Sequence, residues 1–274
     1  GQEIETEDNK PTFGEIDLRG FSDEDVQKYV RGYLNYQRRV NPREFPYIDA
    51  EYIKKRVASL ADKRVNMLAR RPVHAQMLSR LFTDKNFKLE TVTEYELYDK
   101  FVRFMASREQ RKPARGAIAL EDRIRFERHL AWWHWKSART NHFRAADIPS
   151  MVTRVVTPQR PLSQTNLQRD LLAGSILEIT AGEFRFPHRS FTEFFVAEYF
   201  LHEKGRDESL AARSRYLNPE IASFLAQWRL KHEADGIKTM RGWYEELGTQ
   251  RGAVSPLLID LLSADRELQD ELAS

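Results

Sequence analysis

A single histidine, His188, lies where the sequence passes from a strand pattern to a helix pattern. Phe184 and Phe186 alternate with Arg185 as in a half-buried strand, and Pro187 ends that strand. The free amides and positive dipole end of a helix N-terminus attract phosphate, and an adjacent imidazole can add a hydrogen-bond donor. The position of His188 is thus compatible with contact to a phosphate and does not by itself establish one. The alternative is a structural role in which His188 bonds only a backbone carbonyl, which is the commoner role of a single histidine.

The segments on both sides of this histidine have recognisable patterns. Residues 175–179 predict the partner strand of a hairpin that turns at Gly182. Ser190 fits a helix N-cap, with Glu193 as its N3 partner in a capping box. Residues 191–201 are apolar on most sides, so they predict a largely buried helix.

The segment from Phe186 to Leu201, FPHRSFTEFFVAEYFL, resembles a known signature. It is similar to the end of the winged-helix domain of NACHT proteins, signal-transduction ATPases with numerous domains (STAND NTPases) that include the NOD-like receptors. In that family an aromatic strand, a histidine, a Ser-Phe-x-Glu-aromatic-aromatic segment and an alanine recur in this order, and all four are present. The segment looks most like the prokaryotic branch. The resemblance implies that His188 contacts the β-phosphate of bound ADP in the closed state.

Pro72 is the second candidate site residue. It suits the first turn of a helix that continues through Val73, Met77 and Leu78. In NACHT proteins a proline that opens a helix of the first helical domain packs against the adenine ring, and the resemblance implies this role for Pro72. The alternative is that Pro72 only starts the helix.

These candidates must be positioned by a mainly α chain. The patterns predict a helical bundle, then a winged-helix domain with a small β-hairpin, then further helices. By resemblance, residues 1–20 form the exit from a nucleotide-binding core, 21–92 the first helical domain, 93–204 the winged-helix domain, and 205–274 the start of the second helical domain or superhelical arch.

Capping residues and apolar periodicity predict the individual helices. Ser22 caps a first amphipathic helix, and Thr93 with Glu96 forms a capping box for another. The cluster from Trp132 to Trp135 has helical spacing and is interpreted as core rather than as a base-stacking platform. The remaining predicted helices span residues 49–70, 166–173, 208–217, 219–231, 237–247 and 255 onward, with a further turn of helix opened by 147–149.

The composition is that of an ordinary soluble protein, with 274 residues and 41% hydrophobic content. There are no cysteines, which excludes disulfides and thiolate metal sites. No apolar run is long enough for a membrane span, and no signal peptide is visible, so a cytoplasmic location without a membrane partner is expected. The chain begins with Gly rather than Met, which suggests a piece of a longer protein.

The net charge of +3 hides an asymmetry, because residues 100–144 hold twelve Lys or Arg against four acidic residues. Such a stripe is usually a solvated face, but it could bind nucleic acid. The alternative function is therefore a winged-helix nucleic-acid-binding regulator. Its DNA-recognition helix would be residues 166–173, which offer few side chains that could contact bases. That region offers only Gln164, Asn166, Gln168 and Arg169, with Asp170 among them.

Several catalytic motifs are missing. No G-x-x-x-x-G-K-[ST] phosphate loop and no apolar strand with paired acids for magnesium occur, so this chain alone is not expected to hydrolyse ATP. His129 and His134 are five residues apart and do not share a helix face, so no metal site is expected. ADP or ATP with Mg²⁺ would be bound in the intact protein, mostly by the nucleotide-binding core.

The leading hypothesis is the regulatory switch portion of a NACHT-type ATPase, closed with ADP and open with ATP. By resemblance its partners are the N-terminal core and effector of the same protein, a C-terminal sensor with its ligand, and further copies of itself on activation. Such proteins act in innate immunity or anti-phage defence. Nucleic acid is the less favoured partner, and a helical scaffold without nucleotide is a third reading.

Overall fold

Helices dominate the computed structural model, which describes residues 20–89, 92–112, 115–137, 141–203, 208–249 and 253–263. The sheet among these residues has two antiparallel strands, β1 (Glu178–Thr180) and β2 (Glu183–Arg185). The predicted fold class, mainly α with a small β-hairpin, is confirmed. The predicted leader, residues 1–20, lies almost entirely outside the described residues.

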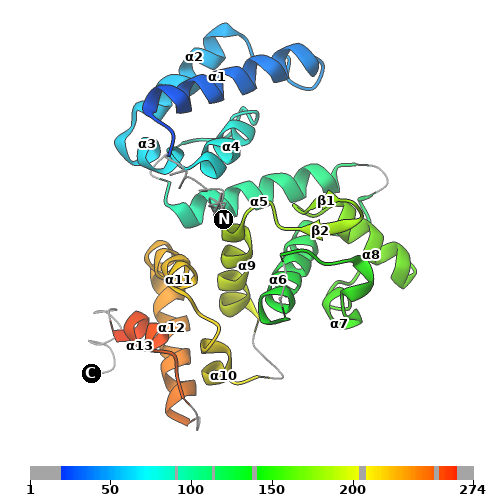
Figure 1. Cartoon of the computed structure of the whole chain (residues 1–274), viewed down its shortest axis with the longest axis vertical. Helices are drawn as coiled ribbons and strands as arrows, with labels where there is room; N and C mark the ends of the chain where they lie inside the picture. The colour runs from blue at the N-terminus through cyan, green and yellow to red at the C-terminus, as the bar shows by residue number, and fades with distance from the viewer. Residues whose placement is uncertain are drawn as a thin grey trace, which may run out of the picture.

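The N-terminal helices form the upper layer in Figure 1. α1 (Asp23–Val40) begins with the predicted cap, Ser22. The predicted helix over 49–70 is wrong, because the chain breaks it into three pieces that precede α4 (Pro72–Leu81). Asp62 adopts an extended ψ of 125° and its side chain caps the third piece, so helix cannot run through it. The pieces are α2 (Ala50–Ala58), the 3₁₀ helix η1 (Ser59–Ala61) and α3 (Lys63–Ala69).

α5 (Glu94–Gln110) crosses the middle of the molecule below this layer (Figure 1). Its N-terminus carries the predicted capping box of Thr93 and Glu96. It is followed by α6 (Leu120–Ser137). On α6, Trp132 is buried while Trp133 and Trp135 are partly buried against the core, which confirms that this aromatic cluster packs inside.

Along the part of the chain that the structure describes, three helical segments and then the hairpin follow α6. The 3₁₀ helix η3 (Ala145–Asp147) and α7 (Ser150–Thr153) precede α8 (Gln164–Ala173) and then the β1–β2 hairpin. Phe143 adds an antiparallel bridge to Phe184 in β2, with N–H···O distances of 3.0 and 2.8 Å in the two directions. The winged-helix assignment of residues 93–204 stays a prediction.

The hairpin turns over two residues, Ala181 and Gly182, which both have positive φ, 51° and 81°. That is the conformation of a type I′ turn, which matches the twist of the flanking strands. The predicted turn at Gly182 is confirmed, whereas the first strand begins three residues later than predicted. Ile179 pairs with Phe184 in the resulting register.

α9 (Arg189–His202) is the central helix, and it packs against α5, α6 and α11 (Figure 1). The prediction of a largely buried helix is confirmed, since Phe191, Phe194 and Phe195 are all in the core. It begins two residues before the predicted start at 191 because a different residue caps it, as described below.

Helices continue to the end of the described chain. The predicted helix 219–231 is confirmed as α11 (Pro219–Lys231), while the helix predicted over 208–217 is only α10 (Leu210–Ser214). α12 (Glu233–Thr249) starts four residues earlier than predicted, and α13 (Pro256–Ser263) follows. None of the helices in the described ranges combines the length and the apolar character needed to cross a membrane.

Candidate functional site

His188 is the N-cap of α9. Its backbone is extended, with φ −151° and ψ 148°, and its Nδ1 accepts a hydrogen bond from the backbone N–H of Ser190 at 3.2 Å. The predicted position of His188 at a helix N-terminus is confirmed. The predicted cap, Ser190 with Glu193, is wrong. The imidazole nitrogen of His188 accepts the hydrogen bond that a capping oxygen would accept, and Ser190 is the second residue of the helix.

A polar cavity of about 460 Å³ opens beside His188 where several helices begin. Arg71, the N-cap of α4, lines it together with Glu94, the first residue of α5, and Pro219, the first residue of α11. The N-terminal ends of α4, α5, α9 and α11 therefore meet at one place. Each such end carries partial positive charge, which attracts an anion, and the carboxylates of Glu94, Glu193 and Glu220 in the lining oppose this attraction.

Pro72 is exposed at the first position of α4, directly after Arg71. Its predicted position at a helix start is confirmed. Arg71 lines the same cavity as His188, whereas Pro72 is not among the lining residues. The structure thus brings the α4 N-terminus and the α9 N-terminus together, and Pro72 is next to the lining residue Arg71 in the sequence.

A chain of ionisable groups fixes the wall formed by α4 and α5. Glu94 Oε1 lies 2.8 Å from Arg71 Nη1 and 3.2 Å from Nε2 of the buried His74. The Nδ1 of His74 donates to the carbonyl oxygen of Leu68 at 3.0 Å. Burial opposes ionisation of Glu94, but the bond and charge of His74, with those of Arg71, hold the pKa of Glu94 below its usual range.

The same surroundings favour the charged form of Glu94 and disfavour the charged form of His188. Partial burial lowers the pKa of His188, and the charges of His74 and Arg71 lower it further, against a smaller opposing effect of Glu193. The imidazole is therefore neutral near pH 7. A neutral imidazole keeps one N–H donor, which is the group that a phosphate oxygen needs.

Glu193 contributes to the opposite wall. Its Oε1 accepts from Nε of Arg189 at 2.9 Å and from Nδ2 of Asn218 at 2.8 Å. Asn218 also caps α11, so these bonds join α9 to α11. Glu220 adds a further carboxylate to the lining. Sequence reasoning missed Arg71, Glu94 and Arg189, although the cap position of Arg71 just before Pro72 was a usable signal.

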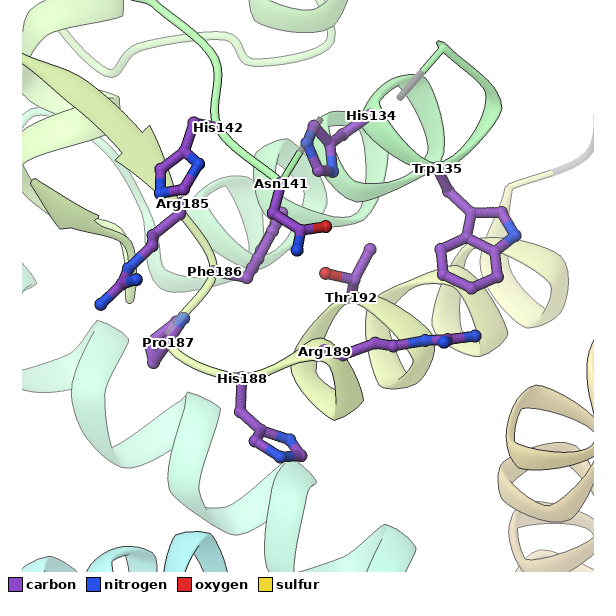
Figure 2. Close-up of a pocket in the computed structure, with 10 residues that line it drawn as sticks. All are labelled: His134, Trp135, Asn141, His142, Arg185, Phe186, Pro187, His188, Arg189 and Thr192. Carbon is purple, nitrogen blue, oxygen red and sulfur yellow. The ribbon is translucent and has the colours of Figure 1, made fainter. Parts of the chain in front are cut away.

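A second cavity, of about 440 Å³, lies on the other side of the His188 backbone. Its ten lining residues include three histidines and two arginines and no carboxylate. Figure 2 shows Arg189 extending toward Trp135, with its Cζ 5.5 Å from the ring centroid. In the same view the His188 imidazole points away from the centre of this cavity. His188 thus stands between two cavities and directs its ring toward the helix N-termini.

The basic stripe of residues 100–144 is largely neutralised within the fold. Eight of its twelve cations form ion pairs. A ninth, Arg123, is buried. The pairs are Arg103 with Asp99 and Glu121, Arg108 with Glu44, Lys112 and Arg115 with Glu109, Arg125 with Glu203, Arg128 with Glu198, Lys136 with Glu208, and Arg144 with Glu183.

The predicted DNA-recognition helix of the alternative hypothesis, α8, also uses its side chains internally. Gln168 Nε2 donates to the carbonyl oxygen of Ala145 at 2.7 Å, and Gln164 Nε2 donates to the hydroxyl of Thr153. Asn166 and Arg169 remain exposed. The internal bonds of Gln164 and Gln168 and the neutralised stripe weigh against sequence-specific nucleic-acid binding.

The site therefore combines an imidazole, two arginines, three carboxylates and the N-termini of four helices around one cavity. In the described part of the chain, no group of three or more His, Asp or Glu side chains is placed to hold a metal ion. A scan against models of known protein families and a search of curated proteins both find no match for this chain.

Proposed function

We propose that this chain is the regulatory portion of a NACHT-type nucleotide switch, which reads whether ADP or ATP is bound to a nucleotide-binding core in the intact protein. In this proposal His188 donates a hydrogen bond to a phosphate of ADP, and Pro72 packs against the adenine ring. The closed state holds ADP and the open state self-associates to activate an effector. A role in innate immune or anti-phage defence belongs to the same proposal.

One observation carries the proposal. His188 and the N-cap of the helix that begins at Pro72 line a single polar cavity, although 117 residues separate His188 from Arg71 in the sequence. The residues present fit a phosphate group, because the cavity offers a neutral imidazole donor, guanidinium groups and helix N-termini. The carboxylates of Glu94 and Glu193 are each bonded to cations. Glu220 is a third carboxylate in the lining, and the arginines and helix N-termini must offset it for a phosphate to bind.

The switch would follow from differential contact. A ligand shifts a two-state equilibrium only through the difference between its interactions in the two states. If α9 meets the phosphate only when the winged helix is docked on the nucleotide-binding core, the bond from His188 stabilises the closed state selectively. An adenine contact by Pro72 would be shared by ADP and ATP, so it would affect affinity more than the choice of state.

The test uses two substitutions that separate the cap from the donor. His188→Ala removes both the cap of α9 and the imidazole, whereas His188→Ser keeps a capping oxygen and removes only the imidazole donor. ADP added to the chain is expected to shift the amide NMR signals of Arg71 and Ser190, with a dissociation constant on the order of millimolar. Both variants should lose this response, but only His188→Ala should lower the melting temperature.

His142→Ala is the matched control, because His142 lines the neighbouring cavity and not this one. It should leave the ADP response unchanged. In the intact ATPase, His188→Ser should raise ADP release and the open population roughly tenfold to a hundredfold, the worth of one charge-assisted bond. Pro72→Ala should have a milder effect. An ADP response that survives in His188→Ser would reduce His188 to a structural cap and overturn the proposal.

A further inference from the structure

Three polar side chains form a line from α5 to the start of α9. The Nδ1 of His188 lies 2.6 Å from the hydroxyl oxygen of Ser190, and that hydroxyl contacts the phenol oxygen of Tyr98. Tyr98 is fully buried on α5, where its ring packs against Phe191 and Phe194 of α9. The line therefore runs from the core to the cavity.

The direction of each hydrogen bond in this line is fixed by chemistry. A backbone N–H can only donate, so the bond from Ser190 N to His188 Nδ1 requires that Nδ1 carries no proton. The Ser190 hydroxyl then donates to Nδ1 and accepts from Tyr98. Burial raises the pKa of Tyr98, which keeps its phenol protonated and able to donate.

The doubly protonated imidazolium is disfavoured by the same geometry. A proton on Nδ1 would replace the bond from Ser190 N–H with a repulsive contact between two donors. The positive end of the α9 dipole and the nearby Arg71 and His74 add to this cost. The one remaining tautomer is neutral, with its proton on Nε2.

We infer that Tyr98 and Ser190 are positioning residues that lock His188 as the Nε2–H tautomer, so that His188 presents a hydrogen-bond donor, and no acceptor, to an anionic oxygen in the cavity. Among the described residues Nε2 makes no hydrogen bond, so its donor is available there. Naming that anion as a nucleotide phosphate rests on the proposed function. The assignment of the tautomer does not rest on the proposed function.

The lock has a consequence for selectivity and for regulation. A donor-only imidazole binds phosphate or carboxylate oxygens and cannot accept from an ammonium or amide N–H. Because Tyr98 belongs to α5 and the other two residues to the α9 N-terminus, the lock holds only while these two helices keep their packing. A shift of α9 relative to α5 would release the tautomer and weaken the donor.

The test reads the tautomer directly by ¹⁵N–¹H NMR of the histidine rings in the whole chain, without nucleotide. His188→Ser identifies which signals belong to His188. We expect Nδ1 to show the signature of an unprotonated nitrogen and Nε2 that of an N–H at pH 7. Ser190→Ala should increase the fraction of other protonation states roughly threefold to tenfold, since one neutral hydrogen bond is lost.

Tyr98→Phe keeps the buried ring and removes the hydroxyl, and it should shift the ratio in the same direction by a smaller factor. Ser190→Thr restores a hydroxyl and should return the wild-type pattern. A wild-type His188 with its proton on Nδ1, or a tautomer ratio that Ser190→Ala leaves unchanged, overturns the inference. Because no ADP is present, this result and the ADP titration above can fail independently of each other.

Discussion

Two glutamates are buried to nearly the same extent and are held in opposite protonation states. Glu198 on α9 is 2% exposed and Glu127 on α6 is 3% exposed. Burial opposes the ionisation of Glu198, but a bond from His202 and the charge of Arg128 lower the pKa of Glu198 to about 2. Burial dominates at Glu127 and raises its pKa to about 8, against a backbone bond from Ile176 and the charge of Arg123.

The difference in pKa between the two glutamates comes from their hydrogen-bond and ion-pair partners and not from their degree of burial. Glu198 accepts from Nη2 of Arg128 at 2.8 Å and from the phenol of Tyr95 at 2.7 Å. Glu127 accepts only from the backbone N–H of Ile176, at 3.2 Å, and its Oε2 has no hydrogen-bond partner within the described ranges. Arg123 lies four residues before Glu127 but donates to the carbonyl oxygens of Arg115 and Asp170 instead.

The two carboxylates therefore stabilise two different junctions between elements of the fold. The Glu198 cluster ties α9, the helix that His188 caps, to α5 and α6 by charge. The Glu127 site holds the start of the hairpin segment to α6 through a neutral carboxyl. The first junction should depend on ionisation and the second should depend on protonation.

The largest expected effect is at Glu198. Glu198→Ala removes the nearer carboxylate partner of the buried Arg128 guanidinium and leaves Glu203, whose Oε1 lies 4.0 Å from Arg128 Nη1, so the free energy of unfolding should fall by about 3 kcal/mol. Urea denaturation at pH 7 measures this loss. The double variant Glu198→Ala with Arg128→Met removes both charges and should recover more than half of it. No recovery in the double variant would mean that volume rather than charge pairing governs this junction.

Little of this pairing could be predicted from the sequence. Glu198 lies 70 residues from Arg128 and 103 from Tyr95, so only the tertiary fold brings them together. Glu127 and Arg128 are neighbours in sequence that face different elements, since a helix turns about 100° per residue. Nothing local marks either carboxylate as buried.

Features governed by local chemistry were predictable. The caps Ser22 and Thr93, the helix start at Pro72 and the placement of His188 before a helix all follow from short-range rules. The N-cap of α9 was mispredicted because histidine is a rare cap and Ser190 was the standard choice. The cavity was not predictable, because four helix N-termini from distant segments converge there.

The next effect concerns the pH dependence of stability at Glu127. The folded pKa of about 8 exceeds the ordinary value of 4.5, so between these pH values the unfolded chain releases a proton that the folded chain retains. This group's contribution is therefore fully present below about pH 4.5 and is lost as pH rises toward 8. Its loss between pH 5 and pH 7 should be on the order of 2 kcal/mol.

Glu127→Gln keeps the acceptor for Ile176 and cannot ionise, so it should remove this pH dependence. Denaturation of the wild type and the variant at pH 5, 6, 7 and 8 tests this point. The two curves should converge at the acid end and separate at pH 8, where the variant should be the more stable. A constant difference across the series would show that Glu127 does not titrate in this window.

The smallest effect is expected for Tyr95→Phe, which removes one of the bonds to Glu198 and keeps the ring that packs against Phe194. Burial and the charge of Glu198 raise the pKa of Tyr95, so its phenol is a donor at every accessible pH. Its loss should cost about 1.5 kcal/mol, near the low end for a bond to a charged group, because Arg128 still pairs with the carboxylate.

The pKa of Glu198 should also rise in Tyr95→Phe. Because the folded pKa of Glu198 is depressed, its stabilisation is present above about pH 4.5 and is lost as pH falls toward 2. The midpoint of acid unfolding should therefore move to higher pH in Tyr95→Phe, whereas Tyr29→Phe, on an exposed tyrosine of α1, should leave it in place. An equal shift in both variants would remove Tyr95 from the Glu198 cluster.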